Sequence, residues 1–119
     1  MFEIGVDIVR IERIEKLWNS YGNRFLAKIF HQEEMEEAKI KGHYFQSLAG
    51  KFAAKEAFIK ATSCFINQPI SFLDIIVLSD SKNKPYIKNT ENLRISFPCQ
   101  FRVSISHEKE YAVSVVAVI

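Results

Sequence analysis

The sequence predicts one α+β domain, residues 1–119, in which helices pack against an antiparallel β-sheet. Helical periodicity fills most of the first half of the chain, and strand periodicity dominates the second half. Hydrophobic residues make up 48% of the chain and include ten Phe, which is ample material for a core. The four Gly and three Pro argue against a disordered chain. No linker or internal repeat divides the sequence, so a single domain follows.

The first half of the chain begins with a strand and continues with helices. Apolar residues alternate with polar or small ones over residues 2–8, which predicts a strand. Over residues 11–18 the apolar side chains fall on one side of a helix, which we expect Gly22 to end. Residues 31–41 are acidic first and basic last, an order that suits a solvated helix. The strongest helical pattern lies at residues 45–61.

The second half alternates strand patterns with polar turns. We expect strands over residues 70–78, 85–88, 93–97, 101–105 and 111–119, and turns over residues 79–84 and 107–110. The last run is apolar apart from Ser114, so its strand should be the most deeply buried part of a hairpin.

Composition excludes several classes of protein. The net charge of +2 falls well short of the excess that nucleic-acid binders carry. Cys64 and Cys99 form neither a metal-binding spacing nor a disulfide framework, so we expect reduced, buried thiols. No apolar run approaches the roughly 18–20 residues of a membrane span, and the N-terminus lacks the pattern of a signal peptide. The sequence therefore predicts a cytoplasmic protein without a membrane or nucleic-acid partner.

An acidic residue in the helix at 45–61 is the first candidate for chemistry. The helix is apolar nearly all round, yet Glu56 lies in it together with lysines, among them Lys60. A buried carboxylate is costly unless it is paired or binds a metal. The simpler alternative is an i,i+4 pair between Glu56 and Lys60, which contributes only about 0.3–0.5 kcal/mol.

Three further features carry both a structural and a functional interpretation. Asp7 is either a strand-end or helix N-cap residue, or a carboxylate that joins Glu56 in holding Mg²⁺. His107 is either a surface turn residue or a functional group at a strand end. Residues 10–28 contain five basic and two acidic residues, a local charge of +3, which is either a solvated face or a docking surface.

Three blocks of sequence identify a family. Residues 5–8 read GVDI, residues 48–61 read LAGKFAAKEAFIKA, and residues 104–112 read SISHEKEYA. The segments SFLDI at 71–75 and KPY at 84–86 fit between them. With these blocks the chain resembles holo-acyl-carrier-protein synthase, the short bacterial type of 4′-phosphopantetheinyl transferase, over nearly its full length.

The resemblance implies the 4′-phosphopantetheinyl transferase fold and a homotrimer with active sites at the subunit interfaces. It also implies an activity. In the presence of Mg²⁺, the 4′-phosphopantetheine group of coenzyme A would move to a serine of apo acyl carrier protein. Adenosine 3′,5′-bisphosphate would be released, and the product would serve fatty acid biosynthesis.

The resemblance also implies a role for individual residues. Magnesium binding falls to Asp7 and Glu56, which with Lys60 are the expected catalytic residues. Glu56 or a metal-held water is expected to accept the serine proton. The expected coenzyme A contacts are Lys51, Lys55, Lys60, Ser106 and His107. The residues expected to dock the acidic carrier protein are Arg13, Leu17, Arg24 and Lys28.

The chain departs from the family pattern at three places. Lys51 stands where the family usually has an arginine, and a lysine supplies charge without the two-pronged phosphate grip. Residues 63–65, Ser-Cys-Phe, replace a glycine-rich turn, and Phe65 does not allow the close backbone approach that glycine permits. Glu108 places an acid beside His107, where it should repel a phosphate.

Two alternatives to an active transferase follow from these residues. A nucleic-acid-binding domain would use the basic first helix and would bind DNA or RNA with a steep salt dependence. It leaves Glu56 in its apolar helix unexplained. A degenerate relative would bind the carrier protein without catalysis, and metal-dependent binding of coenzyme A separates it from an enzyme.

Overall fold

The computed structural model describes residues 2–119 and confirms the α+β class. Its strands and helices follow the chain in this order: β1 (Glu3–Arg10), α1 (Ile11–Leu26), α2 (Gln32–Lys41), α3 (Tyr44–Thr62), β2 (Ile76–Ser79), β3 (Pro85–Lys88), β4 (Phe101–His107) and β5 (Tyr111–Val118). Short 3₁₀ turns lie at Phe72–Asp74 and Thr90–Asn92. Among these residues, no helix is both long and apolar enough to cross a membrane.

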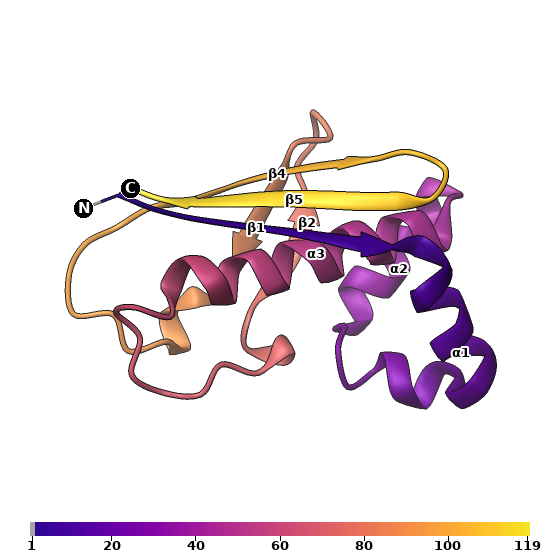
Figure 1. The fold of residues 1–119 in the computed structure, drawn as a ribbon, viewed down its shortest axis with the longest axis horizontal. Helices are drawn as coiled ribbons and strands as arrows, with labels where there is room; N and C mark the ends of the chain where they lie inside the picture. The colour runs from indigo at the N-terminus through magenta and orange to yellow at the C-terminus, as the bar shows by residue number, and fades with distance from the viewer. Residues whose placement is uncertain (1) are drawn as a thin grey trace.

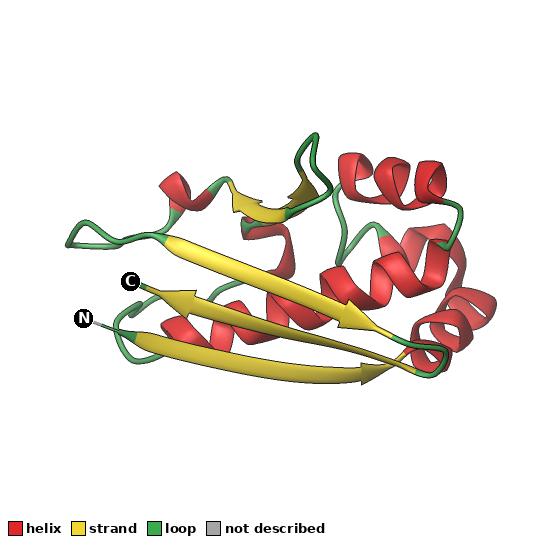
Figure 2. Ribbon diagram, turned by 90° about the horizontal axis from the view of Figure 1, so that it is seen from above, coloured by secondary structure: helices red, strands yellow, loops and turns green. Residues whose placement is uncertain are grey.

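The sheet with strand order β1-β5-β4 is antiparallel throughout and packs with one face on α3 (Figures 1 and 2). β2 and β3 form a separate antiparallel hairpin, and β3 lies near β4. Figure 1 shows α1 and α2 gathered at one end of the long helix. The elements on which the site depends therefore surround α3.

α3 is buried on most sides, as its composition predicts. Its alanines Ala49, Ala53, Ala54, Ala57 and Ala61 are fully buried and belong to two hydrophobic clusters, one along the N-terminal half of the helix and one along its C-terminal half. Small side chains let neighbouring backbone approach closely. Gly5 of β1 uses this space, because a β-carbon there would overlap the carbonyl oxygen of Ala57 and lie 2.8 Å from the nitrogen of Ala61. β1 and α3 are thus in direct backbone contact.

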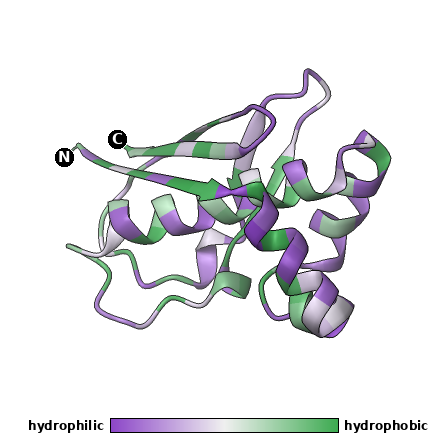
Figure 3. Cartoon of the chain, turned by 45° about the vertical axis from the view of Figure 1, so that its right-hand side comes forward, coloured by the Kyte–Doolittle hydropathy of each residue, from purple (hydrophilic) through white to green (hydrophobic). Residues whose placement is uncertain are grey.

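The other face of the sheet is open and apolar. Ile4, Val6 and Ile8 of β1 are 58%, 54% and 63% exposed. In the register of the sheet they neighbour Ala117, Val115 and Val113 of β5. Figure 3 shows hydrophobic stretches along the strand that ends at the C-terminus. No other described element covers this face, so a continuous apolar surface remains.

One predicted boundary is confirmed and another is wrong. The first helical segment stops at Gly22, which adopts a left-handed φ of 71°, and a second helical segment continues beyond the kink to Leu26. The strand predicted over 70–78 begins only at Ile76, because Ser71 and Asp74 form a capping box that folds residues 72–74 into a 3₁₀ turn.

The strand predicted over residues 93–97 and the burial of both thiols are also wrong. The segment 93–97 carries no strand, because the Arg94 N–H donates to the side chain of Gln68 instead of to a neighbouring strand. Leu93 and Ile95 nevertheless pack on the core. Cys64 is free as expected but exposed, and Cys99 is free and half-buried.

Candidate active site

The contact between β1 and α3 brings Asp7 to Lys60, 53 residues apart in sequence. Lys60 Nζ lies 3.1 Å from Asp7 Oδ1 and donates to the Val6 carbonyl oxygen, also at 3.1 Å. The Asp7 side chain is 17% exposed and the Lys60 side chain 55% exposed, so the pair sits at a surface edge. Asp7 is not a helix N-cap, since Arg10 holds that place on α1. The N-cap interpretation of Asp7 is therefore wrong.

Glu56 lies one helical turn before Lys60 on α3, and residues four apart share a helix face. It is half-buried. The simple pairing of Glu56 with Lys60 is wrong, because Lys60 pairs with Asp7 and no ion pair among residues 2–119 involves Glu56. Among the described residues, the carboxylate of Glu56 therefore has no ion-pair partner, and it lies on the same helix face as Lys60.

The donor set at this edge suits one metal in particular. Within the described chain, no group of three or more His, Cys, Asp or Glu side chains is placed to hold a metal. A closed structural metal site of the zinc type thus does not fit here. Mg²⁺ is usually bound through one or two carboxylates together with water and substrate phosphates. Asp7 and Glu56 fit that pattern.

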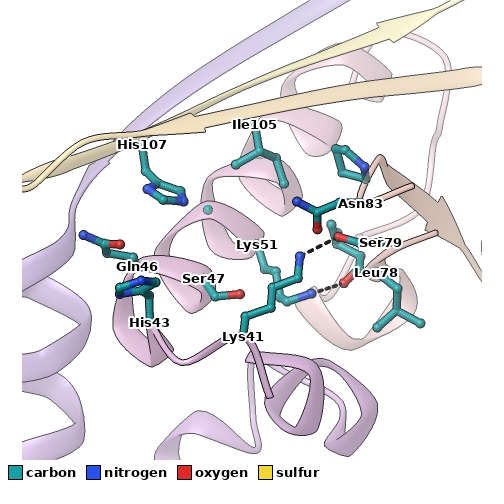
Figure 4. Close-up of a pocket in the computed structure, with 13 residues that line it drawn as sticks. Lys41, His43, Gln46, Ser47, Lys51, Leu78, Ser79, Asn83, Ile105 and His107 are labelled. Carbon is teal, nitrogen blue, oxygen red and sulfur yellow. Dashed lines mark hydrogen bonds between the residues drawn. The ribbon is translucent and has the colours of Figure 1, made fainter. Parts of the chain in front are cut away.

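A pocket of about 340 Å³ lies beside the N-terminal half of α3 (Figure 4). It is lined by α3, by the β2–β3 hairpin, by the α2–α3 junction and by the end of β4. The polar residues that line it include Lys41, His43, Lys51, Ser79, Asn83 and His107. Figure 4 shows His107 and His43 on one side of the pocket and Asn83 on the other. The pocket carries cationic and neutral hydrogen-bonding groups but no acid.

The side chains of Ser106 and His107, at the end of β4, point to opposite faces of the sheet. His107 lines the pocket, whereas Ser106 does not. Because successive side chains of a strand point to opposite faces, exposed Ser106 belongs to the open apolar face of the sheet, where its register partner is Val113. The two residues expected to bind one ligand therefore face different surroundings within one subunit.

Two of the lysines expected at coenzyme A are buried inside the subunit. Lys55 is fully buried, and its Nζ donates to Glu34 at 2.8 Å and to the carbonyl oxygens of Ile29 and Phe72, both at 2.7 Å. These acceptors use all three ammonium hydrogens. Lys55 is therefore a structural residue, and its assignment to coenzyme A is wrong.

Lys51 is buried in a different way. Its side chain lines the pocket, but its Nζ donates hydrogen bonds to Glu37 and to the Val77 carbonyl oxygen.

Glu108 has hydrogen-bond partners that the sequence did not reveal. Its Oε1 accepts hydrogen bonds from the N–H groups of Glu110 and Tyr111, each at 2.8 Å. The hydrogen bond from the Glu110 N–H is the largest cause that lowers the pKa of Glu108. The carboxylate thus stabilises the turn between β4 and β5, and it is not among the pocket residues.

Phe65 has a packing role in this structure, because its ring packs against the ring of Phe97 with centroids 5.2 Å apart.

A basic depression of about 450 Å³ lies on α1. Arg13 and Leu17, both expected there, line it, together with Arg10, Glu12, Lys16, Ser20 and Tyr21. Arg24 and Lys28 are exposed but lie beyond the kink at Gly22 and do not line the depression. Sequence reasoning did not single out Tyr21, although an aromatic residue on the polar side of a helix, 65% exposed here, is a usable signal.

Comparison with known proteins decides which family has this arrangement. The sequence profile of the 4′-phosphopantetheinyl transferase superfamily matches residues 3–116. This chain belongs to that superfamily. Holo-[acyl-carrier-protein] synthases of Chlorobium phaeovibrioides and Halothermothrix orenii are 39% and 40% identical to this transferase, over 94% and 95% of its length and 90% and 93% of theirs.

Solved structures agree with this assignment. The Helicobacter pylori holo-[acyl-carrier-protein] synthase in complex with coenzyme A superposes on this transferase with a TM-score of 0.81 at 37% identity, covering 98% of this chain and 99% of that one. The Bacillus anthracis enzyme in complex with CoA (3′,5′-ADP) gives a TM-score of 0.78 at 38% identity, covering 98% and 94%. The predicted transferase fold is thereby confirmed.

Proposed function

We propose that this chain is a holo-[acyl-carrier-protein] synthase. It transfers the 4′-phosphopantetheine group of coenzyme A to a serine of apo acyl carrier protein and releases adenosine 3′,5′-bisphosphate. The reaction depends on Mg²⁺, takes place in the cytoplasm in support of fatty acid biosynthesis, and requires a homotrimer. The approach of Asp7 and Lys60 across the β1–α3 contact, on the face of α3 that carries Glu56, is the observation that carries this proposal.

The reaction asks the protein for positioning and for neutralisation of charge. Bound Mg²⁺ would offset the negative charge that builds on the leaving phosphate. Asp7 and Glu56 supply carboxylates for the ion, and each is held by a rigid element, β1 or α3. Lys60 is more than half exposed, so its ammonium can reach a diphosphate beside Asp7. Glu56, or a water next to it, accepts the proton of the attacking serine.

The pocket beside His107 is the second part of the proposed coenzyme A site. His107, His43 and Lys41 give it positive or hydrogen-bonding character suited to the phosphates of the nucleotide end. Ser106 and His107 would contact coenzyme A that is bound mainly by the neighbouring subunit. This arrangement accounts for the separation of the pocket from the Asp7–Lys60 edge within one chain.

The open face of the sheet supports the trimer. Ile4, Val6 and Ile8, together with the apolar β5 residues beside them, form a surface that a monomer would leave in water. A second and third copy that cover this face would also bring Ser106 next to a neighbour. The active site would then be completed at the interface.

The depression on α1 is the proposed docking surface for the carrier protein. Arg13 would steer an acidic helix, and half-buried Leu17 would supply an apolar contact. Arg24 and Lys28 extend the positive charge beyond Gly22 toward the outer rim of the carrier.

The test is a transfer assay on the full-length protein. It is mixed with apo acyl carrier protein, coenzyme A and Mg²⁺, and the carrier is analysed by intact-mass spectrometry. We expect the mass of the carrier to rise by one phosphopantetheine group. The Glu56→Gln variant, which keeps the size of the side chain, should lose most of this transfer. An unmodified carrier together with metal-dependent binding of coenzyme A would point to the degenerate relative.

A further inference from the structure

The ammonium of Lys51 faces the interior although its stem lines the pocket. Lys51 is only 4% exposed. Its Nζ donates to the Glu37 carboxylate and, at 2.8 Å, to the Val77 carbonyl oxygen on β2, as the dashed line from Lys51 shows in Figure 4. A phosphate in the pocket would have to break both bonds to receive this charge. Lys51 is therefore poorly placed to serve as a phosphate ligand.

Glu37 joins three elements through its two carboxylate oxygens. One oxygen accepts from Lys51 on α3, and the other accepts from the Ser79 N–H on β2 at 2.8 Å. Ser79 is paired with Pro85 in the β2–β3 hairpin, and both residues line the pocket. The position of this pocket wall thus depends on a side chain of α2 that is absent from the pocket lining.

Each member of the pair favours the charged form of the other. Burial alone would raise the pKa of Glu37, but the hydrogen bonds from Lys51 and from the Ser79 N–H keep that pKa below its ordinary value. Burial lowers the pKa of Lys51, and the hydrogen bond with Glu37 opposes that shift. Lys41, in contrast, is exposed, and its Nζ donates to the Ser79 hydroxyl at 2.7 Å on the rim of the pocket.

We propose that Lys51 and Glu37 are positioning residues for coenzyme A. Their ion pair fixes the β2–β3 wall of the pocket, and Lys41 supplies the positive charge that a bound phosphate meets there. The inference rests on the proposed function, in which this pocket receives part of coenzyme A. It gives the lysine that replaces the family's arginine a different task from phosphate binding.

The Glu37→Ala variant separates the two roles of Lys51 by the sign of its effect. If the pair positions the wall, removing Glu37 frees the hairpin, and the affinity for coenzyme A should fall by about tenfold. If Lys51 binds phosphate directly, the same substitution releases its charge, and binding should tighten or stay unchanged. Isothermal titration of the full-length variant with coenzyme A and Mg²⁺ measures the difference.

Matched variants make the result specific. Glu36→Ala removes the same charge from an exposed neighbour on α2 and should bind coenzyme A like the wild type. Glu37→Gln keeps an acceptor for the Ser79 N–H and should recover part of the lost affinity.

Two lysine variants test the other side of the pair. Lys51→Met should weaken binding by a factor similar to that of Glu37→Ala, and the double variant Glu37→Ala/Lys51→Met should bind no more weakly than either single variant. Lys41→Met should weaken binding and reduce its salt dependence.

Three results would overturn the inference. The first is a Glu37→Ala variant that melts at a lower temperature but binds coenzyme A normally, since this is what a purely structural pair predicts. The second is tighter binding by that variant. The third is a loss of salt dependence in Lys51→Met equal to that in Lys41→Met. A wild-type protein that binds no coenzyme A would instead contradict the proposed function itself.

Discussion

Single residues of α3 divide into those that are exposed at the proposed site and those that are buried in the core. Lys60 and Lys55 lie five positions apart on one helix, yet the Lys60 side chain is 55% exposed and the Lys55 side chain fully buried. From the sequence, both lysines were expected to contact coenzyme A, because the charge of a residue does not reveal whether its side of the helix faces the core or the solvent. Burial places Lys55 in the core and leaves Lys60 free for the role that we propose for it.

The buried pair of Lys55 and Glu34 gives the first prediction. Replacing Lys55 with Met leaves Glu34 buried without its cation and leaves the carbonyl groups of Ile29 and Phe72 without a donor. Breaking a buried pair in this way costs about 3–5 kcal/mol. Urea unfolding should therefore show a loss of that size. The double variant Lys55→Met/Glu34→Gln, which removes both charges, should lose less, and an equal or larger loss would contradict this explanation.

A second prediction concerns Arg13. Charge reversal by Arg13→Glu should raise the KM for apo acyl carrier protein by about tenfold, because it places a negative charge in front of an acidic helix. The affinity for coenzyme A should not change. Lys39→Glu makes the same change of charge on an exposed position of α2 and serves as the control. A parallel loss of coenzyme A binding in Arg13→Glu would show that the two surfaces are not separate.

At the scale of elements, the contact between β1 and α3 sets the geometry of the site. β1 rests on the helix backbone at Gly5, two residues before Asp7, so the height of the strand above the helix determines where the Asp7 carboxylate lies. A residue with a side chain at position 5 would push the strand away. The fold can keep Asp7 beside Lys60 only while this contact stays close.

A third prediction follows from this contact. Gly5→Ala brings a β-carbon against rigid backbone at Ala57 and Ala61, and overpacking of this kind costs about 1–3 kcal/mol. Thermal unfolding should show the loss, and transfer activity should fall with it because Asp7 moves. The control for stability is Gly50→Ala, whose β-carbon would lie 2.8 Å from the Cγ2 atom of Ile105, a side-chain atom, and would meet no backbone. Equal losses in the two variants would contradict the argument.

Elements with a long, regular pattern were predictable from the sequence, and those decided by a distant partner were not. The helix of residues 44–62 and the hairpin of β4 and β5 follow from local periodicity. The segment around Arg94 has a strand-like composition but finds the Gln68 side chain as its partner. The pocket combines Lys41, His43 and Asn83 from separate loops and element ends, and no local pattern places such residues together.

The site residues themselves show the same division. Asp7 and Glu56 stood out as acids in apolar surroundings, and the family resemblance gave them a role. The partners of Lys51 and Lys55 lie on α2, 14 and 21 residues away, and only the tertiary fold shows that Glu37 and Glu34 reach them. The sequence pattern therefore singled out the two acids as candidates, whereas the partners of the lysines could be seen only in the tertiary structure.

At the scale of the whole molecule, the open face of the sheet requires an explanation. The three apolar side chains of β1 on this face, Ile4, Val6 and Ile8, are each more than half exposed while the opposite face of the same sheet is packed on α3. An arrangement in which copies of the chain cover this face would bury the surface and bring Ser106 of one copy against another. Catalysis and assembly are then linked through one sheet.

A fourth prediction tests that link. Val6→Glu puts a charge in the middle of the apolar face and should convert the proposed trimer to a monomer in sedimentation velocity experiments, with loss of transfer activity. Ile40→Glu is the control, because Ile40 is 86% exposed on α2, away from the sheet. A monomeric Val6→Glu variant with full activity would show that the active site is complete within one subunit.

The central claim is that Asp7 and Glu56 act together to hold Mg²⁺ against coenzyme A. Its most direct test measures coenzyme A binding by isothermal titration with and without Mg²⁺, in the wild type and in the Asp7→Asn and Glu56→Gln variants. We expect Mg²⁺ to tighten binding by the wild type and to have little effect on either variant, while both variants retain the metal-free affinity. Variants that respond to Mg²⁺ as strongly as the wild type would place the metal elsewhere and contradict the claim.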